Sequence, residues 1–288
     1  MTGTPLDRRL NAFRADLADA RLRGSVAAGR FVAGRKARVA VPVLDVRAAP
    51  RADAGLDTQL ILGDEVCVFD ENEDYAWVQA GRDSYVGYVA ASGLARPGDA
   101  PTHAVGVPRT FLYAEPDMKK RATAALSLGS RLAIVGAATT RGTDYALLES
   151  GEAVVAAHLR PAGETAPDHV AVAATLERTP YLWGGASAFG IDCSGLVQLS
   201  LLMAGKPAPR DTDMQAAALG APLNVGDDLA GLRRGDLVFW NGHVAIMADG
   251  EEIIHASGHA MMVVRERLAY AIERIARLYG RPVGFRRL

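Results

Sequence analysis

A cysteine in the last third of the chain has the sequence surroundings of a nucleophile. Cys193 lies between two polar residues, Asp192 and Ser194, shortly after a Gly-Gly pair. The mostly apolar residues at positions 196–202 predict a buried helix that begins near Cys193, with Asp192 as its N-cap. A thiol at the positive end of a helix and beside an imidazole has a lowered pKa and reacts as a thiolate. We therefore predict that Cys193 is a catalytic nucleophile.

The carboxylate of Asp192 acts in the opposite direction, because a negative charge beside a thiol raises the pKa of that thiol. We expect this charge to be taken up by the free amides of the helix start or by an amine of the substrate. The second cysteine, Cys67, alternates within a predicted strand and is expected to be an inert apolar side chain.

Two histidines lie on neighbouring apolar strands that a short hairpin loop joins. A two-residue loop that pairs Ala248 with Glu251 would turn His243 and His255 to opposite faces of the sheet. A three-residue loop that pairs Ala248 with Glu252 would put both imidazoles on one face, as diagonal neighbours about 7 to 8 Å apart at Cα. A shared catalytic role requires the three-residue loop or a bulge.

If both rings lie on one face, each has a separate task. His243 takes the thiol proton of Cys193 and later returns it to the leaving amine. His255 forms a hydrogen bond with the other ring nitrogen of His243 and fixes its tautomer. The backbone N–H of Cys193 is one donor to the oxyanion, and Tyr181 is the candidate for the second.

The size and charge of the chain limit what surrounds this site. At 288 residues, two or three compact units are expected. A net charge of -1 and a pI near 6.6 provide no basic surface for nucleic acid or for an anionic membrane, so we expect neither partner. The first residues are too charged for a secretion signal and no stretch approaches the length of a membrane span, which predicts a cytoplasmic protein.

Ahead of the catalytic region, the chain contains an internal repeat. Pro50 recurs as Pro116 and Gly63 as Gly129, each 66 positions later and within similar phrases. Short runs of β-branched and aliphatic residues between turn residues indicate small all-β units. We predict two such units, at residues 37–98 and 102–162.

The segment before the repeat is predicted to be helical. Within residues 1–36, positions 5–23 are expected to form one amphipathic helix that packs on the rest of the protein. The apolar residues that recur there at near-helical spacing are Leu6, Leu10, Phe13, Leu17 and Leu22.

Three phrases after residue 165 resemble the NlpC-type cell-wall peptidases, a papain-like family with a Cys-His-His site. They are D-C-S-G around Cys193, G-H-V-A-I around His243 and I-H-A around His255. The resemblance implies a multidomain protein with two small all-β SH3-like barrels followed by an α+β papain-like catalytic domain at residues 166–288. With two such barrels, it implies an enzyme without cofactor that cleaves the bond between γ-D-glutamate and a diamino acid in murein peptides with a free N-terminal L-alanine. Release of L-Ala-D-Glu would serve recycling of wall peptides.

The same resemblance implies a set of substrate-binding residues. Asp192 and Ser194 would bind the amine of the substrate, and Tyr181 would line that subsite. Arg210 corresponds to an arginine on the substrate side of the family's site.

The first barrel of the family closes this subsite with an acidic residue and a tyrosine. Asp57 and Tyr85 are the candidates for these two roles, although turn and barrel positions explain them equally well. Where the family commonly has a glycine, this chain has Ser84. A closed groove would leave room for two substrate residues, and a carboxylate facing the amine would reject an acylated peptide.

Other classes of function remain open. Cys193, His243 and His255 could bind zinc, although no fourth ligand and no metal-binding spacing is evident. A non-catalytic protein could use the barrels to hold wall peptides. The same papain-like site could also serve an amidase or an acyltransferase. The oligomeric state has no signature in the sequence.

Overall fold

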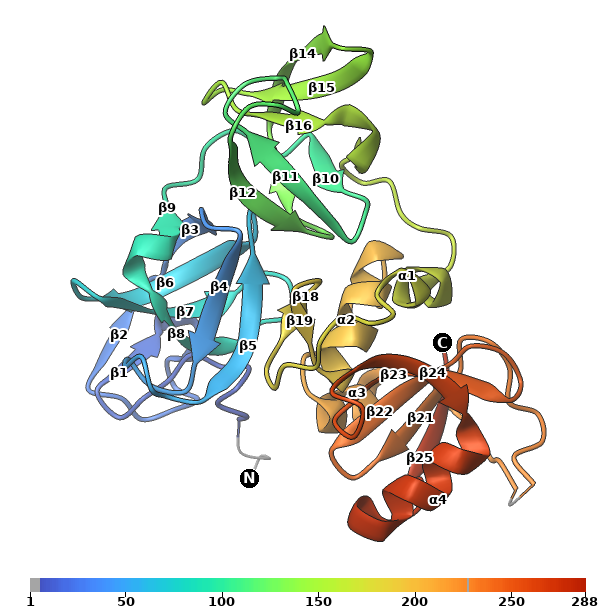
Figure 1. The fold of residues 1–288 in the computed structure, drawn as a ribbon. Coiled ribbons are helices and arrows are strands. Elements are labelled where there is room, and N and C mark those ends of the chain that lie inside the picture. Colours follow the sequence, from blue (N-terminus) through green and yellow to red (C-terminus); the bar gives the residue numbers. More distant parts are fainter. Residues whose placement is uncertain (1–5, 227) are drawn as a thin grey trace. The chain divides into compact units, whose positions relative to one another are not determined.

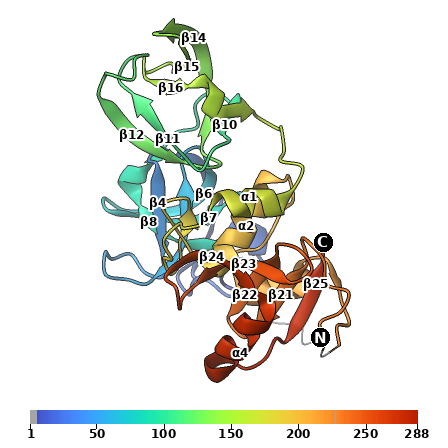
Figure 2. The ribbon, with the colours of Figure 1, turned by 45° about the vertical axis from the view of Figure 1, so that its right-hand side comes forward.

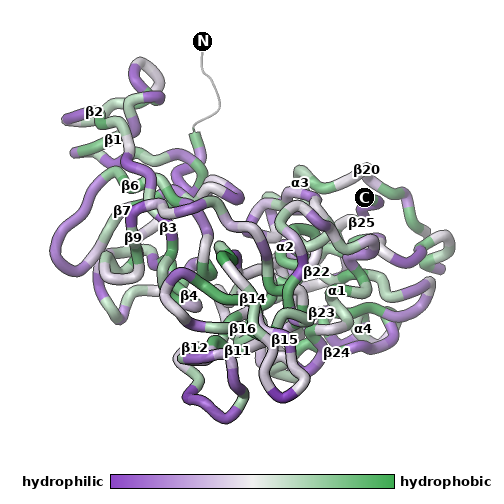
Figure 3. The backbone as a smooth tube through the Cα atoms, turned by 90° about the horizontal axis from the view of Figure 1, so that it is seen from above, coloured by the Kyte–Doolittle hydropathy of each residue, from purple (hydrophilic) through white to green (hydrophobic). Residues whose placement is uncertain are grey.

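The computed structural model describes residues 6–226 and 228–288, and the chain forms two compact units, Met1–Ala162 and Gly163–Leu288 (Figure 1). In Figure 3, hydrophilic positions concentrate in the outer loops of each unit. Among the described residues, no helix has both the length and the apolar character needed to cross a membrane.

The predicted helix over residues 5–23 is wrong for the part that the structure describes; residues 1–5 lie outside the described residues. Residues 6–16 form turns and bridges, followed by strand β1 (Leu17–Asp19) and the 3-10 helix η1 (Ala20–Leu22). β1 pairs in parallel with β2 (Arg30–Val32). Of the apolar residues at helical spacing, Leu17 packs in a cluster with Phe69 and Trp77, whereas Leu6 is 39% exposed and Leu22 lies in η1.

Local ion pairs favour the non-helical conformation of this segment. Three Asp–Arg pairs are formed by residues two positions apart, whose side chains do not face each other on a helix. They are Asp7–Arg9, Arg14–Asp16 and Asp19–Arg21. In addition, the guanidinium of Arg14 lies 4.5 Å from the centre of the Trp77 ring.

The first repeat forms a seven-stranded sheet in the order β5-β4-β8-β7-β6-β3-β9. Its core holds apolar side chains from alternate strand positions, such as Val46, Leu60 and Val78. Cys67 is partly buried in β6. The strands are β3 (Arg35–Val39), β4 (Val43–Arg47), β5 (Leu56–Ile61), β6 (Glu65–Glu71), β7 (Tyr75–Ala80), β8 (Val86–Ala90) and β9 (Leu94–Ala95), with η2 (Ala91–Gly93) before β9.

The second repeat forms a five-stranded sheet in the order β12-β11-β16-β15-β14 and a three-stranded sheet in the order β13-β10-β17. A separate core includes Leu112, Leu126 and Val154. The elements are β10 (His103–Val105), β11 (Arg109–Tyr113), β12 (Ala122–Ser127), β13 (Arg131–Leu132), β14 (Ile134–Thr140), β15 (Thr143–Leu148), β16 (Ala153–Val155), η3 (Ala156–His158) and β17 (Leu159–Pro161).

The strands follow the sequence repeat. β11 and β12 begin and end 66 positions after β4 and β5, the same offset that the sequence phrases have. Gly63 and Gly129 hold the same turn in each copy with φ of 88° and 86°, a conformation that favours glycine. The repeat predicted from the sequence is therefore also a repeat of local structure.

The unit Gly163–Leu288 combines helices with a six-stranded antiparallel sheet in the order β20-β25-β21-β22-β23-β24. Helix α2 packs against β22 and β23, and α4 lies on the other side of the sheet (Figures 1 and 2). The elements are α1 (His169–Thr175), β18 (Ala186–Ser187), β19 (Gly190–Ile191), α2 (Cys193–Met203), α3 (Thr212–Ala218), β20 (Ala221–Pro222), β21 (Leu237–Trp240), β22 (His243–Met247), β23 (Glu252–Ser257), β24 (Met262–Arg267), α4 (Leu268–Tyr279) and β25 (Gly284–Arg287).

Residue parity sets which side chains of the sheet face α4. Ala245, Met247 and Ile253 pack with Leu268 and Ile272 of α4. Because side chains alternate along a strand, the other odd-numbered residues of β22 and β23 belong to the same face. This face therefore includes both histidines of the predicted site.

The anchoring of the N-terminal segment can be measured. Leu17 is fully buried, so Leu17→Ala should lower the free energy of unfolding of its unit by about 2 to 5 kcal/mol. Leu6→Ala is the control, because Leu6 is 39% exposed and its loss should change stability by about 0.5 kcal/mol or less. Urea denaturation followed by tryptophan fluorescence measures both; equal effects would contradict the described packing.

Candidate active site

Cys193 is the first residue of α2, as the sequence predicts, and only 6% of it is exposed. Asp192 is the N-cap, and its Oδ1 accepts a hydrogen bond of 2.7 Å from the backbone N–H of Gly195. This bond satisfies one of the free amides of the first turn, which is how an aspartate starts a helix. The predicted helix start and its cap are confirmed.

The thiol lies beside the backbone on both sides of His243. Its Sγ is 4.0 Å from the carbonyl oxygen of Gly242, and the N–H of Val244 also points toward the sulfur. Burial, and then the charge of Asp192, raise the pKa of Cys193 to about 12, against a smaller lowering by the Val244 amide. The prediction of a lowered thiol pKa is thus wrong for this structure, because the thiol has lost its solvation.

The hairpin between the two histidine strands has the three-residue loop. Ile246 pairs with Ile254, and the N–H of Ala248 donates to the carbonyl of Glu252 at 2.7 Å. His243 Nε2 and His255 Nδ1 consequently lie 2.8 Å apart on one face. The predicted register is confirmed.

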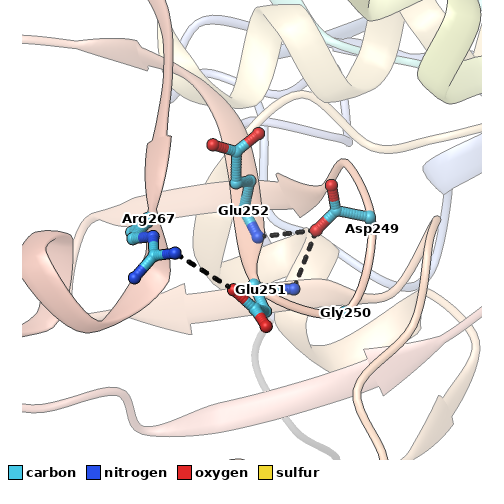
Figure 4. A pocket seen from close by; sticks show the side chains of 5 residues that line it. All are labelled: Asp249, Gly250, Glu251, Glu252 and Arg267. Carbon is cyan, nitrogen blue, oxygen red and sulfur yellow. Dashed lines mark hydrogen bonds and ion pairs between the residues drawn. The ribbon is translucent and has the colours of Figure 1, made fainter.

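The side chain of Asp249 explains why the loop has this length. Its Oδ1 accepts hydrogen bonds of 2.8 Å from the backbone N–H groups of both Glu251 and Glu252 (Figure 4). An aspartate that binds amides two and three residues later closes a turn of its own. Asp249 therefore fixes the loop that sets the register of the histidine strands.

The hydrogen-bond chain continues beyond His255. Glu266 Oε1 lies 2.7 Å from His255 Nε2, and both oxygens of Glu266 bind the guanidinium of Arg274 at 2.5 Å. Sequence reasoning missed these two residues, because they come from a strand and a helix with no spacing rule that connects them to the histidines. The alternation of β24 opposite β23 could have placed Glu266 on the correct face, since Glu266 pairs with Ile253.

His243 is held neutral. Burial, followed by the nearby His255 and Arg274, lowers the pKa of His243 to about 3. The Trp240 ring covers one side of it, with ring centres 5.5 Å apart. A neutral imidazole and a neutral thiol are compatible with general-base catalysis and do not form a preformed ion pair.

Asp192 is neutralised from within the protein. Arg210 donates to both of its oxygens, at 3.0 and 2.6 Å, and to Ser194 Oγ at 2.7 Å. The N–H of Gly184 donates to Asp192 as well, at 3.0 Å. The expectation that backbone amides take up the charge is confirmed, and Arg210 adds a full positive charge.

Arg210 was predicted on the substrate side, but it is only 1% exposed and its donors bind Asp192 and Ser194. In the free protein it supports the first turn of α2 from inside, and a contact of Arg210 with the substrate stays a prediction. Ser194 itself is 5% exposed.

Tyr181 lies close enough to Cys193 and Asp192 for their charges to act on it. Burial, then these two residues, raise the pKa of its phenol above the usual range. A bridge to Ile191, two residues before Cys193, holds its backbone. The phenol therefore keeps its proton and can donate a hydrogen bond.

The two candidates from the first repeat belong to the other unit. Asp57 is partly buried in β5, and Tyr85 is 5% exposed and packs in the core of the seven-stranded sheet. Next to it, Ser84 has φ of 64°, a conformation that favours the glycine expected there. A role of Asp57 and Tyr85 in substrate binding stays a prediction.

The positions of Cys193, His243 and His255 also bear on the alternative that these residues bind zinc. In the part of the chain that the structure describes, no group of three His, Cys, Asp or Glu residues has a metal-binding arrangement. His243 Nε2 and His255 Nδ1 bind each other.

Two segments of the chain match known protein families. Residues 178–278 match the NlpC/P60 family, and residues 46–94 match the bacterial dipeptidyl-peptidase SH3 domain. The chain carries an NlpC/P60 domain behind an SH3 domain.

Relatives and one solved structure extend the match beyond the NlpC/P60 domain. Dipeptidyl-peptidase 6 of Lysinibacillus sphaericus is 28% identical over 73% of this chain and 83% of its own length. The γ-D-glutamyl-L-lysine dipeptidyl-peptidase of Bacillus cereus is 27% identical over 70% of this chain and 67% of its own. A crystal structure of an NlpC/P60 family protein from Bacillus cereus has the same fold, with a TM-score of 0.70 and 21% identity over 88% of this chain and 99% of that one.

The protonation state of the NlpC/P60 thiol can be tested by alkylation. Because the pKa of Cys193 is raised, little thiolate exists at neutral pH, and the rate with iodoacetamide should rise about tenfold per pH unit above pH 7. A Cys67→Ser background leaves Cys193 as the sole thiol. Mass spectrometry of the alkylated protein gives the rate; a plateau between pH 5 and 8 would indicate a thiolate–imidazolium pair instead.

The buried ion pair of the NlpC/P60 domain predicts a large loss of stability. Arg210→Leu leaves the Asp192 carboxylate buried without its partner and should cost about 3 to 5 kcal/mol of unfolding free energy. Arg265→Leu is the control, because Arg265 forms an exposed pair with Glu177 that is worth about 1 kcal/mol or less. Chemical denaturation compares the two; equal losses would refute a structural role specific to Arg210.

Proposed function

We propose that the chain is a cysteine peptidase that cleaves the γ-D-glutamyl–diamino acid bond of murein peptides and releases L-Ala-D-Glu. The observation that carries this proposal is the combination of a thiol at the start of α2 with the hydrogen-bonded His243–His255 pair, inside an NlpC/P60 domain. The names of two relatives, dipeptidyl-peptidase 6 and γ-D-glutamyl-L-lysine dipeptidyl-peptidase, support the substrate class.

The first half of the reaction follows from the neutral thiol and imidazole. As Cys193 Sγ attacks the carbonyl carbon, its proton passes to His243 and the carbonyl oxygen becomes an oxyanion. The backbone N–H of Cys193 and the phenol of Tyr181 donate hydrogen bonds to it. The imidazolium then protonates the departing amine, the C–N bond breaks and a thioester remains on Cys193.

The second half regenerates the enzyme. His243 takes a proton from water, and the resulting hydroxide equivalent attacks the thioester carbon. The C–S bond breaks, and the proton returns to Cys193 Sγ as the acid is released. In each half of the reaction, His243 first accepts a proton and then returns it. Removal of either Cys193 or His243 therefore abolishes turnover.

The preference for a free N-terminal amine needs an acidic group in the subsite. Asp192 is already bound by Arg210 and by two backbone amides, so it contributes a partly neutralised charge. Ser194 and Tyr181 complete the part of the proposed subsite that belongs to the unit Gly163–Leu288. An acylated peptide would leave a buried acceptor without its donor and be rejected.

Recycling of small wall peptides in the cytoplasm is the biological role that this specificity would suit. An amidase or acyltransferase with the same site, and a wall-peptide-binding protein, are the alternatives; neither has an observation of its own in its favour.

Product analysis by mass spectrometry tests the proposed function. L-Ala-γ-D-Glu-meso-diaminopimelate and its L-lysine counterpart should each yield L-Ala-D-Glu, whereas the N-acetylated peptides should react at least about tenfold more slowly. Cys193→Ala should give no product. Cleavage of free and acetylated peptides at equal rates would refute the amine preference, and cleavage by Cys193→Ala would refute the nucleophile.

A further inference from the structure

The hydrogen-bond chain of the site extends two residues past the Cys-His-His set. His255 is 1% exposed and uses both ring nitrogens, Nδ1 toward His243 at 2.8 Å and Nε2 toward Glu266 at 2.7 Å. Glu266 is on β24, and its oxygens both bind Arg274 of α4. A strand and a helix therefore supply an ion pair to the far end of the imidazole chain.

The charge of Glu266 decides which nitrogen of His255 carries a hydrogen. Partial burial raises the pKa of this carboxyl, but the hydrogen bonds from Arg274 and His255 outweigh it and lower the pKa to about 2. An ionised carboxylate can only accept hydrogen bonds. His255 must therefore carry a hydrogen on Nε2.

Arg274 compensates the charge of Glu266. Its guanidinium donates two parallel hydrogen bonds to the carboxylate, so the pair presents no net charge to the buried ring of His255. A neutral His255 with a hydrogen on Nε2 has a lone pair on Nδ1. That lone pair accepts from His243.

His243 must then carry its hydrogen on Nε2, which leaves the lone pair of Nδ1 free. We propose that Glu266 and Arg274 are positioning residues that fix this tautomer, so that Nδ1 of His243 is the base for Cys193. The proposal rests on the proposed function for its effect on turnover. The tautomer itself is a property of the free protein.

The balance between the two charges makes a specific prediction for single and double variants. In Glu266→Gln, Arg274 should hold the amide oxygen, so the amide NH₂ turns to His255 and forces the opposite tautomer on both histidines. In Arg274→Met, the unbalanced carboxylate should favour a charged His255, which donates from Nδ1 and again moves the hydrogen of His243 to Nδ1. The double variant restores a neutral partner whose oxygen is free to accept from His255.

Activity and spectroscopy test this arrangement together. Each single variant should lower kcat by a factor on the order of 10², with KM little changed, and the double variant should recover at least about tenfold over either single one. Long-range ¹H–¹⁵N spectra should show Nε2–H on His243 in the wild type and the double variant, and Nδ1–H in both single variants. Glu177→Gln and Arg265→Met are the matched controls, because they alter a Glu–Arg pair of the same domain whose arginine is on the opposite face of β24 from Glu266.

Several results would overturn the proposal. A wild-type His243 with its hydrogen on Nδ1 would do so without any variant, even if a variant failed to fold. Single variants within about twofold of wild-type kcat, or a double variant no better than the worse single one, would also do so. If the wild type cleaves neither murein peptide, the proposed function fails, but the spectra still decide the tautomer.

Discussion

The hydrogen bonds of Asp249 to its own hairpin loop are the constraint on which the site depends. They close a three-residue loop, which fixes the pairing of β22 with β23 and thereby places His243 and His255 on one face. A slip of one residue would turn every side chain of one strand to the opposite face. An exposed turn thus sets the relative position of the His243 and His255 imidazoles, which a contact between the rings could not fix alone.

Burial and charge balance then act on the aligned groups. Loss of solvation keeps both Cys193 and His243 neutral, by raising one pKa and lowering the other. The charged side chains next to them occur in balanced pairs, Asp192 with Arg210 and Glu266 with Arg274. The site therefore contains charges at short range without a net field that would ionise the thiol in the free protein.

Features that depend on neighbouring residues could be predicted from the sequence. Three features are of this kind: Asp192 before an apolar helix, the choice between two hairpin registers, and the 66-residue repeat. The structure contains the capped helix, one of the two registers and the repeat. The prediction of an N-terminal helix is wrong because apolar spacing carries no information about ion pairs two residues apart. The Glu266–Arg274 pair and the interior place of Arg210 depend on tertiary contacts between elements, which leave no spacing rule in the chain.

The raised pKa of the thiol and the proposed tautomer of His243 are parts of one arrangement. A preformed thiolate would not need a base, whereas a neutral thiol needs a lone pair that is already directed at it. The Asp192–Arg210 pair limits how far the carboxylate opposes ionisation of the sulfur, and the Glu266–Arg274 pair keeps the proton on the far nitrogen of each imidazole. Arrival of the substrate carbonyl would then supply the driving force for proton transfer. The negative charge that develops on the carbonyl oxygen would be stabilised by the backbone N–H of Cys193 and the phenol of Tyr181.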